Sequence, residues 1–100
     1  MRVEELHIRE FQEMMKHLYL HRDSERGVAG TYDWLTDEVA ELGEALNGND
    51  KEELQKEFAD VVAWLASLAN ITGVYLETAA VAKYNYKCPK CGCSPCECTF

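Results

Sequence analysis

The sequence contains few residues that interrupt helices. It has two prolines and six glycines among 100 residues, and both prolines, Pro89 and Pro95, lie close to the C-terminal end. No stretch shows the apolar and polar alternation of a half-buried strand, and no segment is repeated. These absences argue against a loop-rich or disordered chain and predict an all-α fold in one small domain.

The sequence also lacks a long apolar run. Nowhere do about 18 apolar residues follow one another, which is the length that a membrane-spanning helix needs. The first residues, MRVEELHIREFQE, mix charged and apolar side chains and contain no hydrophobic signal core. We therefore expect a soluble, cytoplasmic protein without a membrane partner.

Cationic residues are in the minority. Ten Lys and Arg stand against 18 Asp and Glu, which gives a formal net charge of −8. Proteins bind DNA and RNA largely through Lys and Arg that neutralise backbone phosphates, so this balance argues against a polymeric nucleic acid as partner. A smaller phosphorylated ligand would need metal ions between its phosphates and the acidic side chains.

Four segments favour helices because apolar residues recur in them at three- and four-residue steps. The segment HRDSERGVAGT between the first two has no such periodicity and is expected to be a loop. A domain of this size buries only a modest core, so we expect a homo-oligomer, either a dimer or a tetramer. The four expected helices span about residues 3–21, 31–47, 51–72 and 75–86.

Local signals predict where these helices begin and end. Thr31 is the expected N-cap of the second helix, and Asn47 with Gly48 supplies a stop that tolerates left-handed backbone angles. Asp50, followed three residues later by a glutamate, resembles a capping box for the third helix, which Gly73 ends.

Two glutamates lie in the middle of apolar helix faces. At about 100° per residue, Glu38 falls inside an apolar arc, and Glu41 lies roughly 60° to one side. Glu57 and Asp60 repeat this arrangement on the third expected helix. The apolar neighbours are Trp34, Leu35, Leu42 and Ala45 in the first case and Leu54, Val61, Trp64 and Leu68 in the second.

Carboxylates in an apolar interface are costly unless they are paired or bound to a cation. Mg²⁺ prefers oxygen ligands, and carboxylates three residues apart share a helix face, so two such pairs could hold ions that also contact phosphate. Glu38, Glu41, Glu57 and Asp60 are therefore the candidate catalytic residues and ligands of Mg²⁺, with Mn²⁺ as a substitute. The competing interpretation is that they form ordinary solvated helix faces.

The two acidic motifs also carry a resemblance to a known family. WLTDEVAELGEAL followed by EFADVVAWLASLANITG resembles the MazG-type, all-alpha nucleotide pyrophosphohydrolases, whose signature is ExxE, a spacer and ExxD. The resemblance covers about residues 11–87 and implies a four-helix domain, at residues 1–87, that forms at least a dimer. It implies the following magnesium ligands: Glu38, Glu41, Glu57 and Asp60. It further implies that Lys83 contacts phosphate.

The resemblance implies hydrolysis of nucleoside triphosphates, NTP or dNTP, to the monophosphate and pyrophosphate, as in nucleotide-pool sanitation. Magnesium ions on the four carboxylates would favour attack of water at the α-phosphorus, with Glu41 as the candidate general base. Two alternatives stay open. One is a phosphoribosyl-ATP pyrophosphohydrolase of the same superfamily, and the other is a non-catalytic metal-binding or oligomerisation module.

Four further residues are candidates for substrate binding. Trp64 lies one turn beyond the second acidic motif, where its indole could stack on a nucleobase, and Trp34 lies one turn before the first. Both could also be plain core residues. Arg22 and Arg26 could neutralise phosphates that metal leaves uncovered, or could pair with acidic neighbours on the surface.

All five cysteines lie in the tail of residues 88–100. CPKCGCSPCEC contains one CxxC at Cys88 and Cys91 and another at Cys93 and Cys96, with Cys98 left over. Thiolate pairs with this spacing suit tetrahedral zinc, although the pairs lie closer together than in ordinary zinc ribbons. The tail is thus a candidate zinc knuckle, with a mobile reduced tail and disulfides as the alternatives.

Overall fold

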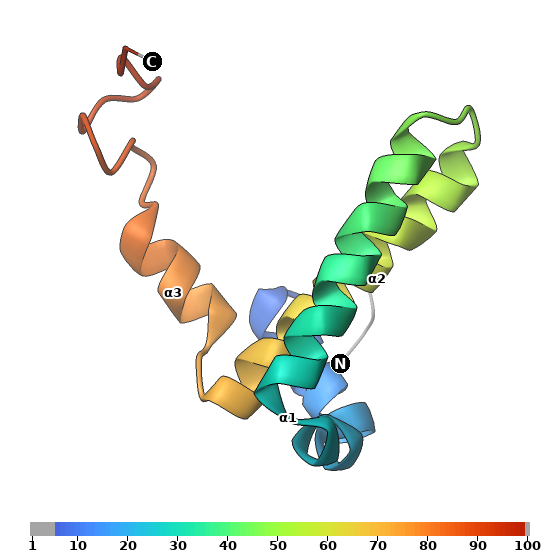
Figure 1. Ribbon diagram of the computed structural model, residues 1–100. Coiled ribbons are helices and arrows are strands. Elements are labelled where there is room, and N and C mark those ends of the chain that lie inside the picture. The colour runs from blue at the N-terminus through green and yellow to red at the C-terminus, as the bar shows by residue number, and fades with distance from the viewer. Residues whose placement is uncertain (1–5, 100) are drawn as a thin grey trace.

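The computed structural model describes residues 6–99 and contains three helices. They are α1 (Ile8–Leu46), α2 (Lys51–Thr72) and α3 (Leu76–Lys83). The second part of α1 runs antiparallel beside α2, whereas α3 turns away from this pair and leads into the tail (Figure 1). No strand occurs between residues 6 and 99, which confirms the prediction of an all-α fold.

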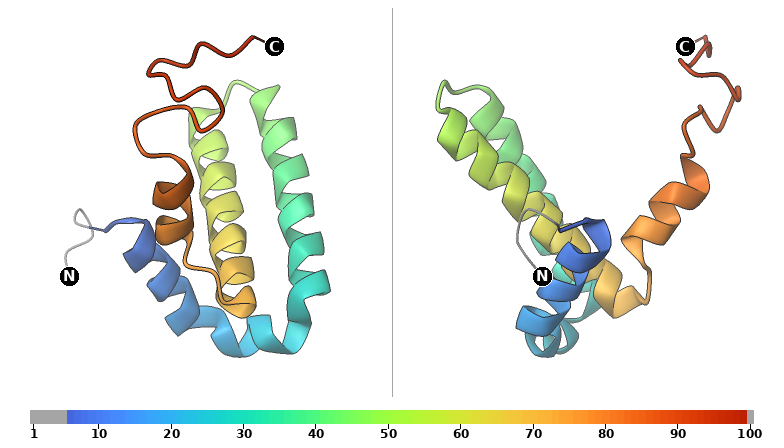
Figure 2. Two further views of the ribbon diagram at one scale, coloured as in Figure 1. Left: turned by 90° about the vertical axis from the view of Figure 1, so that its left-hand side faces the viewer. Right: turned by 180° about the vertical axis from the view of Figure 1, so that it is seen from behind.

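The first two expected helices form one bent helix, so the predicted count of four is replaced by three. Helix α1 continues through residues 21–31, where we expected a loop, and departs from helical geometry at Gly27, with φ 83° and ψ 175°. Glycine adopts a positive φ without the steric cost that a Cβ imposes. Figure 2 shows the two arms of α1, blue and teal to green, that diverge from this bend.

Polar side chains inside the bend explain why the sequence pattern was misleading there. Thr31, our expected N-cap, lies within α1 at 0% exposure and accepts a hydrogen bond from Arg26 Nη1 at 3.2 Å. Asp23 is 1% exposed and accepts from the same nitrogen at 2.9 Å. A search for apolar periodicity misses buried polar residues. The predicted end of the first helix at about residue 21 was therefore wrong.

The other helix boundaries agree better with the sequence. Helix α1 stops at Leu46 as expected, although its C-cap Asn47 has a right-handed φ of −84°. Asp50 caps α2 by accepting hydrogen bonds from two N–H groups of the first turn, at 3.0 and 3.2 Å. Gly73, with φ 74°, ends α2. Helix α3 is shorter than the predicted segment 75–86, and Val3, expected in the first helix, lies outside the described residues.

The predicted apolar faces of α1 and α2 pack against each other. They are partly buried at the predicted positions, which are Leu35, Leu42, Ala45, Leu54, Val61 and Leu68. The buried apolar residues Met15, Ala66 and Ala69 come from the first arm of α1 and the second half of α2. The first arm therefore supplies part of the core, while the second arm supplies the acidic residues.

One side of α2 remains uncovered in the single chain. Phe58, Val62 and Leu65 are 51, 46 and 42% exposed. Their spacing of four and three residues places them on one stripe of the helix.

No single helix among residues 6–99 is long and apolar enough to cross a membrane. Helices α2 and α3 reach that threshold only as a pair, and they are bent relative to each other by 97°.

A buried glutamine fastens the first arm of α1 to the turn between α2 and α3. Gln12 Nε2 donates to Asn70 Oδ1 at 3.0 Å and to the carbonyl of Val74 at 2.8 Å. Gln12 Oε1 accepts from the backbone N–H of Leu76 at 2.9 Å, and Asn70 Nδ2 donates to the carbonyl of residue 12 at 3.2 Å. These bonds orient α3, which otherwise has few neighbours.

Replacing Gln12 with Ala should therefore destabilise the fold. The change leaves the carbonyl of Val74 and the N–H of Leu76 without their partner in part-buried contacts, where each lost hydrogen bond costs about 0.5–1.5 kcal/mol. Urea denaturation of Gln12→Ala and of the control Glu13→Ala, an exposed neighbour, tests this expectation. Equal stabilities of the two variants would contradict it.

Candidate functional site

Three carboxylates meet between α1 and α2. Glu38 and Glu41 lie one turn apart on the second arm of α1, and Glu57 approaches them from α2. One carboxylate oxygen of each residue lies within 4.8 Å of the others. The three-residue spacing places the first two on one side of α1, and the packing of α2 brings in the third. The structure thus joins three of the four predicted metal ligands in one cluster, which we call the acidic cluster.

Two members of the acidic cluster have carboxylate oxygens that are inaccessible to solvent. Glu38 Oε2 and Glu57 Oε2 are buried and have no hydrogen-bond partner among the described residues. Burial, together with a hydrogen bond to Glu41 and the negative charges around it, raises the pKa of Glu38 to about 7. Burial also raises the pKa of Glu57, to which Glu53 and Glu41 contribute. Negative charge at this place is therefore unfavourable unless a cation balances it.

Asp60, the fourth predicted ligand, lies beside the acidic cluster without belonging to its closest group. Its charge contributes to the raised pKa of Glu38 and of Glu57, so it lies within electrostatic reach of both. Asp60 also lines a cavity of about 280 Å³. The other lining residues are Met15, Tyr19, Arg22, Asp23, Arg26, Ala63, Trp64 and Ser67. Asp60 therefore connects the acidic cluster with a cavity that contains two of the predicted arginines and one tryptophan.

The two tryptophans stack on each other. The ring centroids of Trp34 and Trp64 lie 5.4 Å apart, and their planes differ by 10°. Trp34 is 50% exposed, whereas Trp64 is partly buried and lines the cavity. This contact joins the two tryptophans to each other, so stacking on a nucleobase stays a prediction, and the exposed part of Trp34 is open to a further planar group.

Arg26 is held in a fixed position beside Trp64. Its guanidinium lies 4.7 Å from the Trp64 ring centroid and is paired with Asp23 at 2.9 Å. The ion pair that we considered as an alternative therefore exists, but with a buried carboxylate instead of one on the surface. A Cβ at Gly30 would lie 2.8 Å from Arg26 Cγ, so the absence of a side chain there makes room for the arginine. Arg22 is exposed and lines the same cavity.

Lys83 lies apart from these residues in the single chain. It is at the end of α3, which extends away from the α1 and α2 pair (Figure 1), and its Nζ lies 5.7 Å from the Tyr84 ring centroid. It does not line the cavity beside Asp60. It is also absent from a second pocket that borders the acidic cluster and is lined by Glu41, Glu44, Ala45, Glu53 and Glu57.

Sequence reasoning missed two residues at this site. Asp23 lines the cavity, and its Oδ2 is buried with no hydrogen-bond partner among the described residues. Glu53, which the sequence indicated as part of the capping box of α2, lies beside Glu57 in the pocket that borders the acidic cluster. The four-residue spacing of Glu53 and Glu57 could have indicated this contact. No local signal distinguished Asp23 from a surface residue.

Comparison with protein families gives a match to the MazG nucleotide pyrophosphohydrolase domain over residues 27–92. The chain belongs to this family. The match contains both acidic motifs and so confirms the predicted family on more than half of the chain. A comparison with curated proteins found no match.

The acidic cluster of this MazG domain fits hard divalent cations. Such ions take carboxylate oxygens as ligands, and the cluster offers several, two of them buried and without partners. A bound cation would offset the repulsion that raises the pKa of Glu38 and Glu57.

The cysteines of the MazG chain form a second group of possible metal ligands, different from the predicted one. The structure brings together Cys88, Cys91, Cys96 and Cys98, whereas our predicted set contained Cys93 and left Cys98 out. Spacing alone suggested two CxxC pairs, but the path of the backbone decides which sulfurs meet.

The raised pKa of Glu38 predicts how the stability of metal-free protein depends on pH. The folded value of about 7 exceeds the reference value of 4.5, so the folded state keeps its proton to higher pH than the unfolded state does. The resulting penalty is absent below pH 4.5, grows between pH 4.5 and about 7, and is constant above. With EDTA present, Glu38→Gln should therefore have a higher Tm than the wild type at pH 8 but not at pH 4.5.

Thermal unfolding at both pH values, followed by circular dichroism, measures this difference. The control Glu52→Gln removes an exposed carboxylate of α2 and should leave the pH dependence of the Tm unchanged. Adding Mg²⁺ at pH 8 should raise the Tm of the wild type more than that of Glu38→Gln. If the Tm of wild type and of Glu38→Gln changed equally between the two pH values, the pKa of Glu38 would not be raised in the folded state.

Proposed function

We propose that the chain is a Mg²⁺-dependent, cytoplasmic hydrolase that converts NTP or dNTP to the nucleoside monophosphate and pyrophosphate, and serves nucleotide-pool sanitation. The catalytic domain would comprise residues 1–87. The main support is the acidic cluster, whose crowded carboxylates border a cavity with arginine and tryptophan side chains. Membership of the MazG family supports a pyrophosphohydrolase activity.

The carboxylates of two helices would hold the cations. In this proposal the ligands are Glu38, Glu41, Glu57 and Asp60, with Mn²⁺ able to replace Mg²⁺. When bound, these ions supply charge neutralisation of the phosphates and activation of the attacking water. Glu41 is the most exposed member of the acidic cluster, so it is the group best placed to accept a proton from water at the solvent side.

The cavity beside Asp60 would receive the organic part of the nucleotide. Its volume of about 280 Å³ is close to the lower end, about 300 Å³, of ordinary ligand pockets. Arg22 and Arg26 place positive charge at its wall, which suits phosphate oxygens next to the cations. Trp34 or Trp64 would stack on the base.

A second copy of the chain would complete the assembly as a dimer or tetramer. The support is the exposed stripe of Phe58, Val62 and Leu65 on α2, together with the small number of fully buried side chains. Lys83 could contact phosphate only if α3, from the same or a neighbouring copy, approaches the acidic cluster.

Pyrophosphate release from canonical and modified NTPs and dNTPs tests the proposed reaction. Glu38→Gln and Glu57→Gln should lower kcat/KM by about 100-fold or more, since losing a metal ligand removes several kcal/mol of transition-state stabilisation. Circular dichroism should show unchanged helicity, because neutral glutamine fits the same space without repulsion. The control Glu52→Gln should retain the wild-type rate.

The products and substrates separate the alternatives. A phosphoribosyl-ATP pyrophosphohydrolase would release pyrophosphate from phosphoribosyl-ATP in preference to any nucleoside triphosphate in the panel. A non-catalytic module would release none with Mg²⁺ from any of them. Full activity of Glu38→Gln would refute the role of the acidic cluster.

Disruption of the exposed stripe tests the assembly. Val62→Lys places a charge in the middle of the stripe and should shift the mass measured by light scattering toward that of one chain, 11.4 kDa. Gln55→Lys adds the same charge elsewhere on the exposed surface of α2 and should leave the oligomer intact. A wild-type protein that is monomeric at all accessible concentrations would refute the proposed oligomer.

A further inference from the structure

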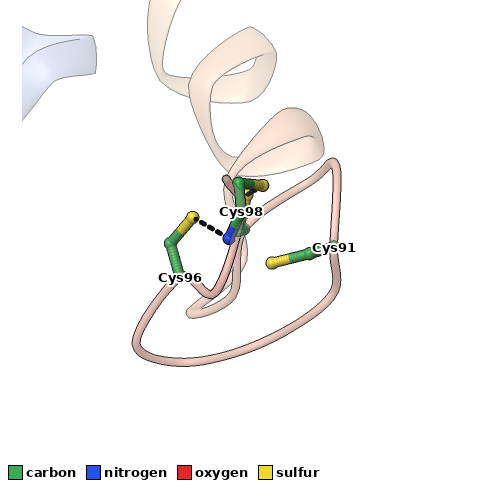
Figure 3. A group of neighbouring side chains, drawn as sticks. Cys91, Cys96 and Cys98 are labelled. Carbon is green, nitrogen blue, oxygen red and sulfur yellow. Dashed lines mark hydrogen bonds between the residues drawn. The ribbon is translucent and has the colours of Figure 1, made fainter. Parts of the chain in front are cut away.

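The tail after α3 brings four cysteine sulfurs to one place. The Sγ atoms of Cys88, Cys91, Cys96 and Cys98 all lie within 4.8 Å of one another. In Figure 3, Cys91 and Cys96 lie on opposite sides of the tail loop, with Cys98 between them. Regular helix and strand are absent from residues 88–99, so the tail has no helical or sheet framework to hold this arrangement.

Backbone hydrogen bonds shape the first half of this loop. The N–H of Gly92 donates to the carbonyl of Cys88 at 2.7 Å, and the N–H of Cys88 donates to the carbonyl of Cys93 at 3.0 Å. Gly92 has a φ of 75°, which glycine adopts readily and other residues rarely do. The resulting tight turn places the sulfurs of Cys88 and Cys91 on the same side, as two ligands of one ion require.

Backbone N–H groups also point at the sulfurs. The N–H of Glu97 donates to Cys91 Sγ at 3.4 Å, and the N–H of Cys98 donates to Cys96 Sγ at 3.2 Å. Hydrogen bonds to a thiolate favour its charged form, which is the form that binds metal. The second half of the loop therefore supports its sulfurs as ligands.

The distances between sulfurs fit a common metal better than a disulfide. Cys88 Sγ and Cys98 Sγ lie 3.6 Å apart. Four sulfurs at about 2.3 Å from a tetrahedral Zn²⁺ are separated by about 3.8 Å, whereas a disulfide requires about 2.05 Å. All five cysteines are free in this structure. Cys93 stands outside the group, with its Sγ 3.6 Å from the carbonyl oxygen of Cys91.

We propose that Cys88, Cys91, Cys96 and Cys98 bind one structural Zn²⁺ through four thiolates, and that Cys93 is not a ligand. Four protein ligands leave no open position on the ion, so the site is structural and does not hydrolyse substrate. The tail lacks a core of its own, and metal binding would supply the free energy that folds it. This site consists of other residues than the acidic cluster. It also differs in chemistry, because thiolates suit Zn²⁺ whereas carboxylates suit Mg²⁺.

The test compares two serine variants of the full chain. Wild type, Cys93→Ser and Cys98→Ser are purified under reducing conditions and dialysed against Zn²⁺. Bound zinc is then measured by inductively coupled plasma mass spectrometry. Wild type and Cys93→Ser should each retain about one zinc per chain after exposure to a weak chelator, because both keep four thiolates. Cys98→Ser should lose most of it, since one ligand is missing.

Three outcomes would overturn the proposal. They are a reduced wild type without zinc, equal retention by the two variants, and loss in Cys93→Ser with retention in Cys98→Ser. Replacing Zn²⁺ with Co²⁺ provides a second measurement, the visible absorption spectrum. Co²⁺ in a tetrahedral thiolate site should produce absorption bands in wild type and Cys93→Ser. Neither measurement depends on nucleotide hydrolysis, so zinc binding can fail while the proposed hydrolase activity stands.

Discussion

The electrostatic cost of carboxylates brought together between two helices is the constraint on which the rest of this structure depends. The apolar faces of α1 and α2 must pack to form the domain, and Glu38 and Glu57 lie within those faces. Packing therefore removes water from their oxygens and brings them near Glu41 and Asp60. Hydrophobic burial holds the acidic cluster together against its own repulsion, and crowded carboxylates of this kind suit divalent cations.

The bend in α1 links this cluster to the cavity beside it. Gly27 permits a change of direction that returns the first arm of α1 to the second half of α2. Within the bend, Asp23 and Thr31 bind the guanidinium of Arg26, which lies against Trp64. Two residues of the bend, Asp23 and Arg26, thus also line the cavity. This double role explains why a segment without apolar periodicity is ordered.

The sequence predicted the acidic site better than the helix count. Apolar periodicity placed Glu38 and Glu57 correctly, because a helix face is determined by local spacing. It failed at residues 21–31, where the buried side chains of Asp23 and Thr31 are polar and bind Arg26 within the same segment. It also failed to show Gln12 as a fastening residue, since its partners Asn70, Val74 and Leu76 lie about 60 residues away.

By itself, the sequence determined the all-α class, the limits of α2, the family and the inward direction of Glu38 and Glu57, since each depends on residue type and spacing within one helix. Tertiary structure alone decided that Asp60 borders the cavity and that Asp23 is buried. It also decided that Cys98 takes the place of Cys93 in the cysteine group. Those outcomes depend on how the backbone bends at Gly27 and Gly92, and the spacing of residues along the chain carries no information about such turns in space.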